Sequence, residues 1–219
     1  MNAGKIDLVW NGLTITDERK ENMQISIPYL TNEQAVVVKG DNASKYTKLA
    51  DLAGKKVAVE KESAGEGTAL DIKDNKKIDI NVKSITAQID ALMEVKSGQS
   101  DLAIIDSTMA GYLLNQKDGS YTDLKIVTIS DYEQQAEEYG VAAKKGNTKL
   151  IDFINSKLVE LQDTKYSEIA ETYGLSSRKV KMTWTTSLTG DEWKSELKNK
   201  KKVVIGYTVN APMGIELDK

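Results

Sequence analysis

The sequence of 219 residues contains no cysteine and no histidine. The absence of cysteine excludes disulfides, thiolate catalysis and cysteine-based metal sites, and it leaves the redox compartment open. The absence of histidine removes the commonest general base and the commonest transition-metal ligand. Any catalysis would then have to use carboxylates, and our expectation is a binding protein with no catalytic residue, no bound metal and no cofactor.

Long apolar runs are also missing, since no stretch approaches the roughly 20 residues that span a bilayer. Met1 opens onto the polar sequence "NAGK", so we expect no signal peptide in this chain. The net charge is −3 with both signs interspersed, which argues against nucleic acid or an anionic membrane as partner. The composition is that of a soluble globular protein, with room for one large domain or two small lobes.

What the sequence does contain is an alternation of strand-like and helix-like segments, which is typical of a parallel sheet with helices on both faces. Strands are predicted at 6–10, 34–38, 56–60, 80–85, 102–106, 125–129, 139–143 and 202–207. Helices are predicted after Ser63 and at 85–98, 147–163 and 165–175, the third of these capped by Asn147 or Thr148. The fold class is therefore α/β.

A cluster of hydrogen-bond donors follows the first predicted strand, "IDLVW". It contains Asn11, Gly12, Thr14 and Arg19. In open α/β sheets ligands bind at the carboxyl ends of the strands. Arg19 with Gly12 and Thr14 can clamp a carboxylate through charge-assisted and backbone hydrogen bonds.

Two further clusters end predicted strands. In "VEKESAGEGTALDI", Ser63 and the residues after it begin a helix whose free amides can bind an anion, although a simple helix cap explains the same residues. Asp106 ends "DLAIID", where its carboxylate either caps the next helix or faces a cationic ligand. Together the three clusters fit a free α-amino acid, or another small zwitterion, held between two lobes.

Several motifs carry a family resemblance. They are "GKIDLVWNGLTITDERKENMQISIPYLTNEQAVVVK", "LADLAGKKVAVEKESAGE", "DLAIIDS", "EEYGVAAKKGNTKL" and "KKVVIGYTVNAPMGIE". They resemble the extracytoplasmic solute-binding proteins of ABC importers, in the polar amino acid branch. The first four match that family in order, and the last resembles the family's first strand and its loop. The resemblance implies a two-lobed, periplasmic-binding-protein-like fold with a hinge. It also implies a location at the cell surface or in the periplasm, and the permease subunits of an ABC importer as partners.

The resemblance further implies a set of ligand-binding residues: Asn11, Gly12, Thr14, Arg19, Ser63, Ala64, Asp106 and Asn210. Arg19 would pair with the ligand α-carboxylate and Asp106 with the α-ammonium. Trp10 and Glu60 are candidates for shaping the side-chain pocket, with core packing as the alternative for Trp10. Asn210 stands where the family usually carries an aromatic residue that stacks on the ligand.

The order of the segments departs from the family pattern. The segment that resembles the first strand, 202–207, comes last, and one βαβ crossover, a unit of roughly 30 residues, is missing. The chain therefore resembles a circular permutant with a deletion, or a piece cut across the junction of two tandem domains. We expect strand 202–207 to pair with 6–10 and to remain a sheet edge.

The predicted organisation follows from these motifs. Lobe one would hold residues 1–36, 128–175 and 200–219, lobe two 37–127, and 176–199 would be a linker or leader-like segment. The free edge predicts self-association, either edge to edge or as a homodimer formed by strand exchange (domain swapping) of residues 201–214, with a monomer as the alternative.

The predicted function is non-covalent binding of a polar L-amino acid by closure of the lobes, as substrate receptor of an ABC importer. The alternatives are a ligand-dead or domain-swapped fragment of such a receptor and, on the same fold, a dehydratase-like enzyme. In that enzyme Glu60 or Asp106 would act as acid or base.

Overall fold

The computed structural model describes residues 5–117, 119–197, 200, 202–207 and 212–213. The chain divides into two compact units, which are described separately. Unit 1 is formed by the described parts of 1–32, 137–209 and 213–219, and unit 2 by those of 33–136 and 210–212. The chain passes between the units at 32/33 and 136/137, where the sequence suggested 36/37 and 127/128. Segment 176–197 belongs to unit 1.

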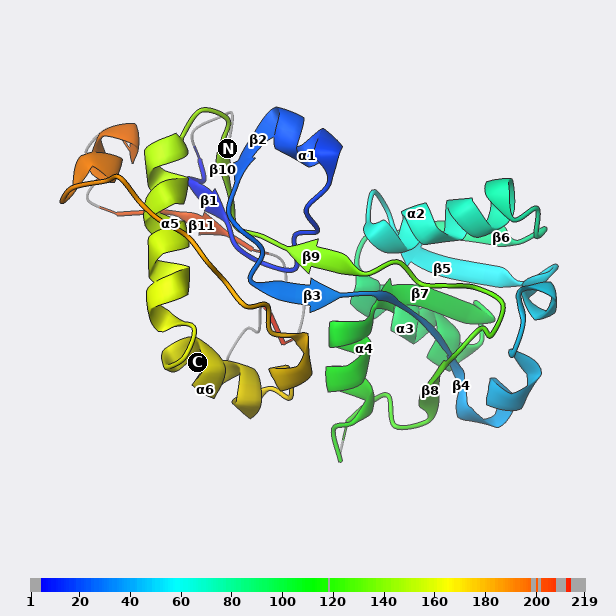
Figure 1. The fold of residues 1–219 in the computed structure, drawn as a ribbon. Helices are drawn as coiled ribbons and strands as arrows, with labels where there is room; N and C mark the ends of the chain where they lie inside the picture. The colour runs from blue at the N-terminus through cyan, green and yellow to red at the C-terminus, as the bar shows by residue number, and fades with distance from the viewer. Residues whose placement is uncertain (1–4, 118, 198–199, 201, 208–211, 214–219) are drawn as a thin grey trace. The chain divides into compact units, whose positions relative to one another are not determined.

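Unit 1 is built on a small sheet with strand order β11-β1-β10-β2 and a separate pair, β3 with β9. Its elements, labelled in Figure 1, are β1 (Leu8–Val9), α1 (Asp17–Asn22), β2 (Met23–Ile25), β3 (Leu30–Asn32), β9 (Glu137–Tyr139), β10 (Ala142–Lys144), α5 (Thr148–Leu161), α6 (Lys165–Thr172) and β11 (Ile205–Gly206). The single strand predicted at 139–143 is wrong. It is two strands, interrupted at Gly140, whose N–H donates to the carbonyl of Leu13 instead of continuing the ladder.

The C-terminal strand pairs as the sequence predicted. β11 lies parallel to β1, with Ile205 opposite Leu8 and Gly206 opposite Val9. Within the described residues, β11 is the end of its sheet. The side chains of Val203, Ile205 and Tyr207 are 40%, 46% and 53% exposed, so this edge is both open and apolar.

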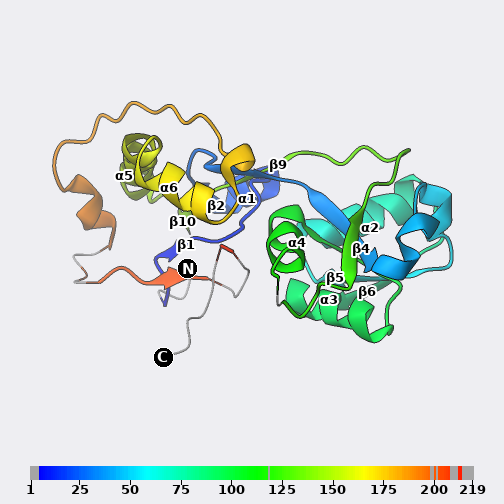
Figure 2. The same cartoon turned by 90° about the horizontal axis from the view of Figure 1, so that it is seen from below.

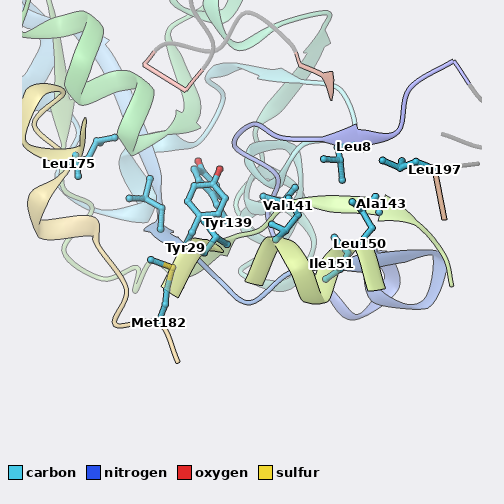
Figure 3. Packing of buried hydrophobic residues seen from close by; sticks show 14 residues of the cluster. Leu8, Tyr29, Tyr139, Val141, Ala143, Leu150, Ile151, Leu175, Met182 and Leu197 are labelled. Atoms are coloured by element: carbon cyan, nitrogen blue, oxygen red, sulfur yellow. The ribbon is translucent and has the colours of Figure 1, made fainter. Parts of the chain in front are cut away.

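The core of unit 1 forms between the sheet and α5. Leu150, Ile151, Ile154 and Leu158 form the buried apolar stripe of this helix. They pack with the buried side chains of Leu8, Tyr29, Tyr139, Val141 and Ala143, and Figure 3 shows the two tyrosines lying close together within this cluster. Each large apolar side chain buried in this way contributes about 1.5–3 kcal/mol to stability.

Segment 176–197 packs against this core. It runs past α6 and α5 in both views (Figures 1 and 2), with Met182 and Leu197 buried and Trp193 stacked on Phe153 at 4.5 Å between ring centroids. The Glu196 carboxylate accepts hydrogen bonds from the backbone N–H groups of Lys149 (3.1 Å) and Leu150 (2.8 Å).

Glu196 therefore supplies the cap of α5. Asn147 occupies the N-cap position, but its side chain makes no cap hydrogen bond, so the cap predicted from the sequence is wrong. The first-turn amides of a helix need acceptors from somewhere, and here a carboxylate distant in sequence provides them.

Unit 2 contains a sheet of order β6-β5-β7-β4-β8. Its elements are β4 (Gln34–Lys39), β5 (Lys56–Glu60), α2 (Ala64–Leu70), β6 (Asn81–Ile85), α3 (Gln88–Ser97), β7 (Leu102–Asp106), α4 (Ser107–Leu114) and β8 (Leu124–Val127). β5, β6 and β7 are parallel, but β4 is antiparallel to both β7 and β8. The sheet is therefore mixed, with the predicted parallel pairing confined to β5, β6 and β7. β4 and β8 are the segments by which the chain enters and leaves unit 2, so they run in opposite directions.

Helices cover both faces of this sheet, as predicted (Figures 1 and 2). Along β4, Val36 and Val38 face the side of α2, while Val37 faces α3 and α4. All five residues of β7 are buried. This two-sided burial fixes the register of β7, and with it the position of Asp106 at the strand end.

Close packing of α2 on the sheet generates a testable prediction. A Cβ on Gly65 would lie 2.6 Å from the carbonyl oxygen of Ile104, whereas one on Gly67 would meet nothing within 4 Å. We expect Gly65→Ala to destabilise the protein by about 1–3 kcal/mol through overpacking. Gly67→Ala should stabilise it by about 0.5–1 kcal/mol, because alanine is the better helix former. Urea unfolding of both variants measures the difference. Equal effects would contradict the close approach of α2 to β7.

Candidate functional site

In unit 1 the predicted donors lie on the segment that leads from β1 into α1. The Thr16 hydroxyl accepts a hydrogen bond from the Arg19 backbone N–H (3.2 Å) and so caps α1. The Arg19 guanidinium donates through Nη1 to the Thr14 carbonyl oxygen (2.7 Å). This contact holds the guanidinium beside Thr14, the residue with which the sequence grouped it.

Arg19 is half-buried and forms no ion pair with any described carboxylate. A guanidinium carries five N–H donors in a rigid planar fork. One of these is used by Thr14, so the fork retains the capacity for a bidentate bond to a carboxylate.

The neighbouring predicted residues take different roles. The Thr14 side chain is buried and donates to Glu137 Oε2 (3.2 Å), and the Asn11 carbonyl accepts from the Tyr29 hydroxyl (2.8 Å). Trp10 packs against the unit 1 core, 6.4 Å from the Tyr29 ring. Core packing therefore accounts for Trp10. Asn11, Gly12, Thr14 and Arg19 lie on one short segment.

In unit 2 the predicted residues lie where two neighbouring parallel strands end. Glu60 ends β5, Asp106 ends β7, and Ser63 with Ala64 begins α2 just after β5. The Ser63 hydroxyl accepts from the Glu66 backbone N–H (3.1 Å) and donates to the Glu60 carbonyl (2.7 Å). Ser63 is thus an N-cap, as its sequence context predicts.

Asp106 is buried and is held by two glutamines. Gln34 donates through Nε2 to Oδ1 of Asp106 (2.8 Å), and Gln88 donates through Nε2 to Oδ2 (2.6 Å). Asp106 occupies the N-cap position of α4 but makes no side-chain cap bond to the helix. Helix capping, the alternative for this residue in the sequence, is therefore wrong.

Glu60 lies next to this network. Burial raises the pKa of the Glu60 carboxyl, a hydrogen bond from Gln88 acts in the opposite direction, and the negative charge of Asp106 raises the pKa further. Within the described residues Glu60 forms no ion pair. A positive charge brought to this edge of the sheet would relieve the repulsion between the two carboxylates.

Gln34 and Gln88 were not predicted from the sequence. Gln34 begins an apolar strand and Gln88 the first turn of a helix, positions where a polar residue is unremarkable. Asn210 lies outside the described residues. Among the residues that the structure describes, no group of three or more acidic side chains is arranged to hold a metal ion.

A cavity of about 670 Å³ lies elsewhere in unit 1. It is bounded by β2, α5 and residues 184–188 and contains none of the predicted ligand-binding residues. Its walls carry an ion pair, Lys149 with Glu192 (3.0 Å). The predicted binding residues are therefore not those that line this cavity.

The chain consists of two α/β units, one carrying the Arg19 guanidinium and the other the buried Asp106 carboxylate, which agrees with the two-lobed fold that the resemblance implied. Residues 1–176 match the family described as bacterial extracellular solute-binding proteins, family 3. The chain belongs to this family, as the resemblance of its motifs indicated. The family is extracellular, and none of the helices in the described part of the chain is long and apolar enough to cross a membrane.

Individual relatives agree with this assignment. A probable histidine-binding protein from Neisseria gonorrhoeae is 31% identical over 180 residues, which are 79% of this chain and 62% of that protein. The structure of an amino acid ABC transporter substrate-binding protein from Streptococcus pneumoniae, bound to L-arginine, is 28% identical with a TM-score of 0.68, covering 81% of this chain and 72% of that one.

One structural relative connects the fold to an enzyme. An ancestral amino acid-binding protein, described as a precursor of cyclohexadienyl dehydratase, is 29% identical with a TM-score of 0.68, covering 78% of this chain and 70% of that one. The chain spans about three fifths of the length of the first curated relatives that it matches.

The raised pKa of Glu60 predicts a pH-dependent stability. Because the folded pKa lies above the unfolded one, the protonated carboxyl favours the folded state. Its contribution is complete below the ordinary glutamate pKa of about 4.3 and is lost as the pH rises through the folded pKa. In ligand-free protein we therefore expect Glu60→Gln to be more stable than wild type at about pH 7.5, with a difference that disappears at about pH 4.

Urea unfolding at the two pH values measures this difference. Glu62→Gln, on the same turn but exposed, is the matched control and should show little change at either pH. A stability difference for Glu60→Gln that is independent of pH would contradict the electrostatic account.

Proposed function

We propose that this protein binds a free polar L-amino acid non-covalently and serves as the substrate receptor of an ABC importer. The observation that carries the proposal is the half-buried Arg19 guanidinium, held beside Thr14 without an ion pair to any described carboxylate. A relative named as histidine-binding and a structure bound to L-arginine support an amino acid as ligand.

The proposed roles follow the chemistry of each group. Arg19, with the loop residues Asn11, Gly12 and Thr14, holds the α-carboxylate through a bidentate, charge-assisted contact. Asp106 takes the α-ammonium. Ser63 and Ala64 add hydroxyl and amide contacts, and Glu60 contributes to the pocket for the ligand side chain.

The proposed partners are the permease subunits of the importer, which the receptor meets outside the cytoplasm. Non-covalent binding makes the protein a receptor and not an enzyme. The specific observation in favour of an enzyme is Glu60, since a carboxyl with a raised pKa suits general acid catalysis. Turnover of cyclic acids, measured with wild type and Glu60→Gln, distinguishes the two functions.

Arg19→Ala tests the proposal directly. Removing one partner of a charge pair typically costs about 2–5 kcal/mol, which corresponds to a loss of affinity of about 30- to 5,000-fold. The ligand is found by a thermal shift screen of the twenty amino acids, since a ligand at a hundred times its Kd stabilises by about 2.7 kcal/mol. Isothermal titration then gives the affinity of each variant.

Lys20→Ala is the matched control. Lys20 follows Arg19 on α1, is exposed and forms an ion pair with exposed Asp17, so its removal should change affinity by less than about fivefold. If Arg19→Ala binds as tightly as Lys20→Ala, Arg19 is not the carboxylate anchor. A wild-type protein stabilised by none of the twenty amino acids would support the ligand-dead alternative.

The open edge of β11 supports a second copy of this chain as a further partner. Val204 and Gly206 direct their carbonyl groups to β1, which leaves the backbone of Ile205 on the outer side of the strand. An apolar edge of this kind pairs readily with another strand, either edge to edge or by exchange of residues 201–214.

Light scattering at several protein concentrations should show a mass that rises above that of the monomer. The substitution Ile205→Lys should suppress this rise. A monomeric mass at every concentration would exclude self-association.

A further inference from the structure

Two glutamine side chains surround the Asp106 carboxylate. Gln34 comes from the first residue of β4, Gln88 from the first residue of α3, and Asp106 from the last residue of β7. All three are buried, with exposed fractions of 3%, 8% and 4%. Three elements that are distant in sequence therefore place their polar ends at one edge of the unit 2 sheet.

The two glutamines donate their hydrogen bonds to different oxygens of the Asp106 carboxylate. Gln34 donates to one oxygen at 2.8 Å and Gln88 to the other at 2.6 Å. Gln34 also stands directly opposite Asp106 in the β4–β7 ladder, so the strand register itself brings the two side chains together. The two amides therefore hold both oxygens of the carboxylate, one from each glutamine.

Gln88 holds Asp106 at a second point. Its Oε1 accepts the backbone N–H of Asp106 at 2.8 Å, while its Nε2 donates to the side chain of the same residue. Rotating the amide by half a turn would lose both bonds. A single glutamine thus fixes the backbone and the side chain of Asp106 relative to each other.

This arrangement keeps Asp106 away from the helix that follows it. An aspartate at an N-cap position ordinarily accepts hydrogen bonds from the amides of the first helical turn, but Asp106 makes no such bond to α4. The two glutamines direct its oxygens elsewhere. A carboxylate withheld from its own helix is suited to bind a cation from outside.

We propose that Gln34 and Gln88 are positioning residues that orient the Asp106 carboxylate toward the ligand α-ammonium, and thereby make a free α-amino group a requirement for binding. The inference rests on the proposed function and adds the chemical class that the site rejects, namely carboxylic acids that lack the α-amino group. Neither glutamine is assigned any contact with the ligand.

A double-mutant cycle tests the inference. Gln88→Met and Gln34→Met keep the length of the side chain but remove its donors. Each is made in wild type and in the Asp106→Asn background. Affinity is measured by isothermal titration for the L-amino acid that gives the largest thermal shift and for the same molecule with hydrogen in place of its amino group.

In the wild-type background we expect each replacement to lower the affinity for the amino acid by about tenfold to a hundredfold. The affinity for its des-amino analogue should fall by less than about threefold. In the Asp106→Asn background the same replacements should change neither affinity by more than about threefold, because the group that they orient is gone. Gln99→Met, an exposed replacement in the same unit, is the control and should match wild type.

The outcomes separate this inference from the function on which it rests. A wild-type protein that binds no amino acid overturns both. Two results would overturn the positioning role alone, provided that the wild type binds an amino acid. In the first, the glutamine replacements reduce the affinity for the amino acid and for its analogue equally. In the second, they reduce affinity as much in the Asp106→Asn background as in wild type. If Gln88→Met does not fold, Gln88→Asn takes its place, since the shorter amide keeps the chemistry and loses the reach.

Discussion

A carboxylate buried at the end of β7 is the constraint on which the organisation of unit 2 depends. Asp106 is 4% exposed, and an ionised group at that depth must be hydrogen-bonded for the fold to tolerate it. The donors come from Gln34 and Gln88, so the β4–β7 register and the start of α3 both have to be correct. A slip of β4 by one residue would turn Gln34 to the other face and leave one carboxylate oxygen without its amide.

In unit 1 the charged group of the candidate site, Arg19, is held by a local contact. The guanidinium of Arg19 is held by a carbonyl from its own loop, five residues earlier, and not by a network drawn from several elements. This local support places the cation but uses only one of its donors. Unit 1 thus holds its cation through one local contact, whereas unit 2 holds its carboxylate through side chains from two other elements.

The sequence predicts best where burial is two-sided. The strands at 56–60 and 102–106 are found with the predicted bounds, because a strand covered on both faces is a continuous apolar run. α1 was not predicted, since none of its residues is buried and it has no apolar period to detect. β2 and β3 were missed because their three residues each, Met23–Ile25 and Leu30–Asn32, mix polar and apolar side chains and form no apolar run. The cap of α5 could not be predicted from the residues around the start of that helix. It is Glu196, which lies far along the chain from the backbone N–H groups that donate to it.

In the candidate site, too, some residues have a local sequence signal and others depend on contacts between distant segments. Arg19, Ser63 and Asp106 are recognisable because each follows or ends an apolar strand, and the three positions together suggest a ligand, although in the sequence Ser63 and Asp106 taken singly are explained as helix caps. Gln34 and Gln88 carry no such signal, since their importance arises only when β4, α3 and β7 meet. Local pattern therefore locates the charged groups, while the groups that orient them emerge from tertiary contacts.

The raised pKa of Glu60 is a cost in stability that the proposed binding function would explain. Its ionised form is disfavoured by burial and by Asp106, so at neutral pH it weakens the fold that contains it. A protein selected only for stability would replace it with glutamine, which can accept the same hydrogen bond from Gln88 without the charge. Local rules of this kind are broken mainly at functional sites, where a ligand supplies the missing interaction. For Glu60 the missing interaction is a positive charge, and the α-ammonium proposed for Asp106 would bring one to the same edge of the sheet.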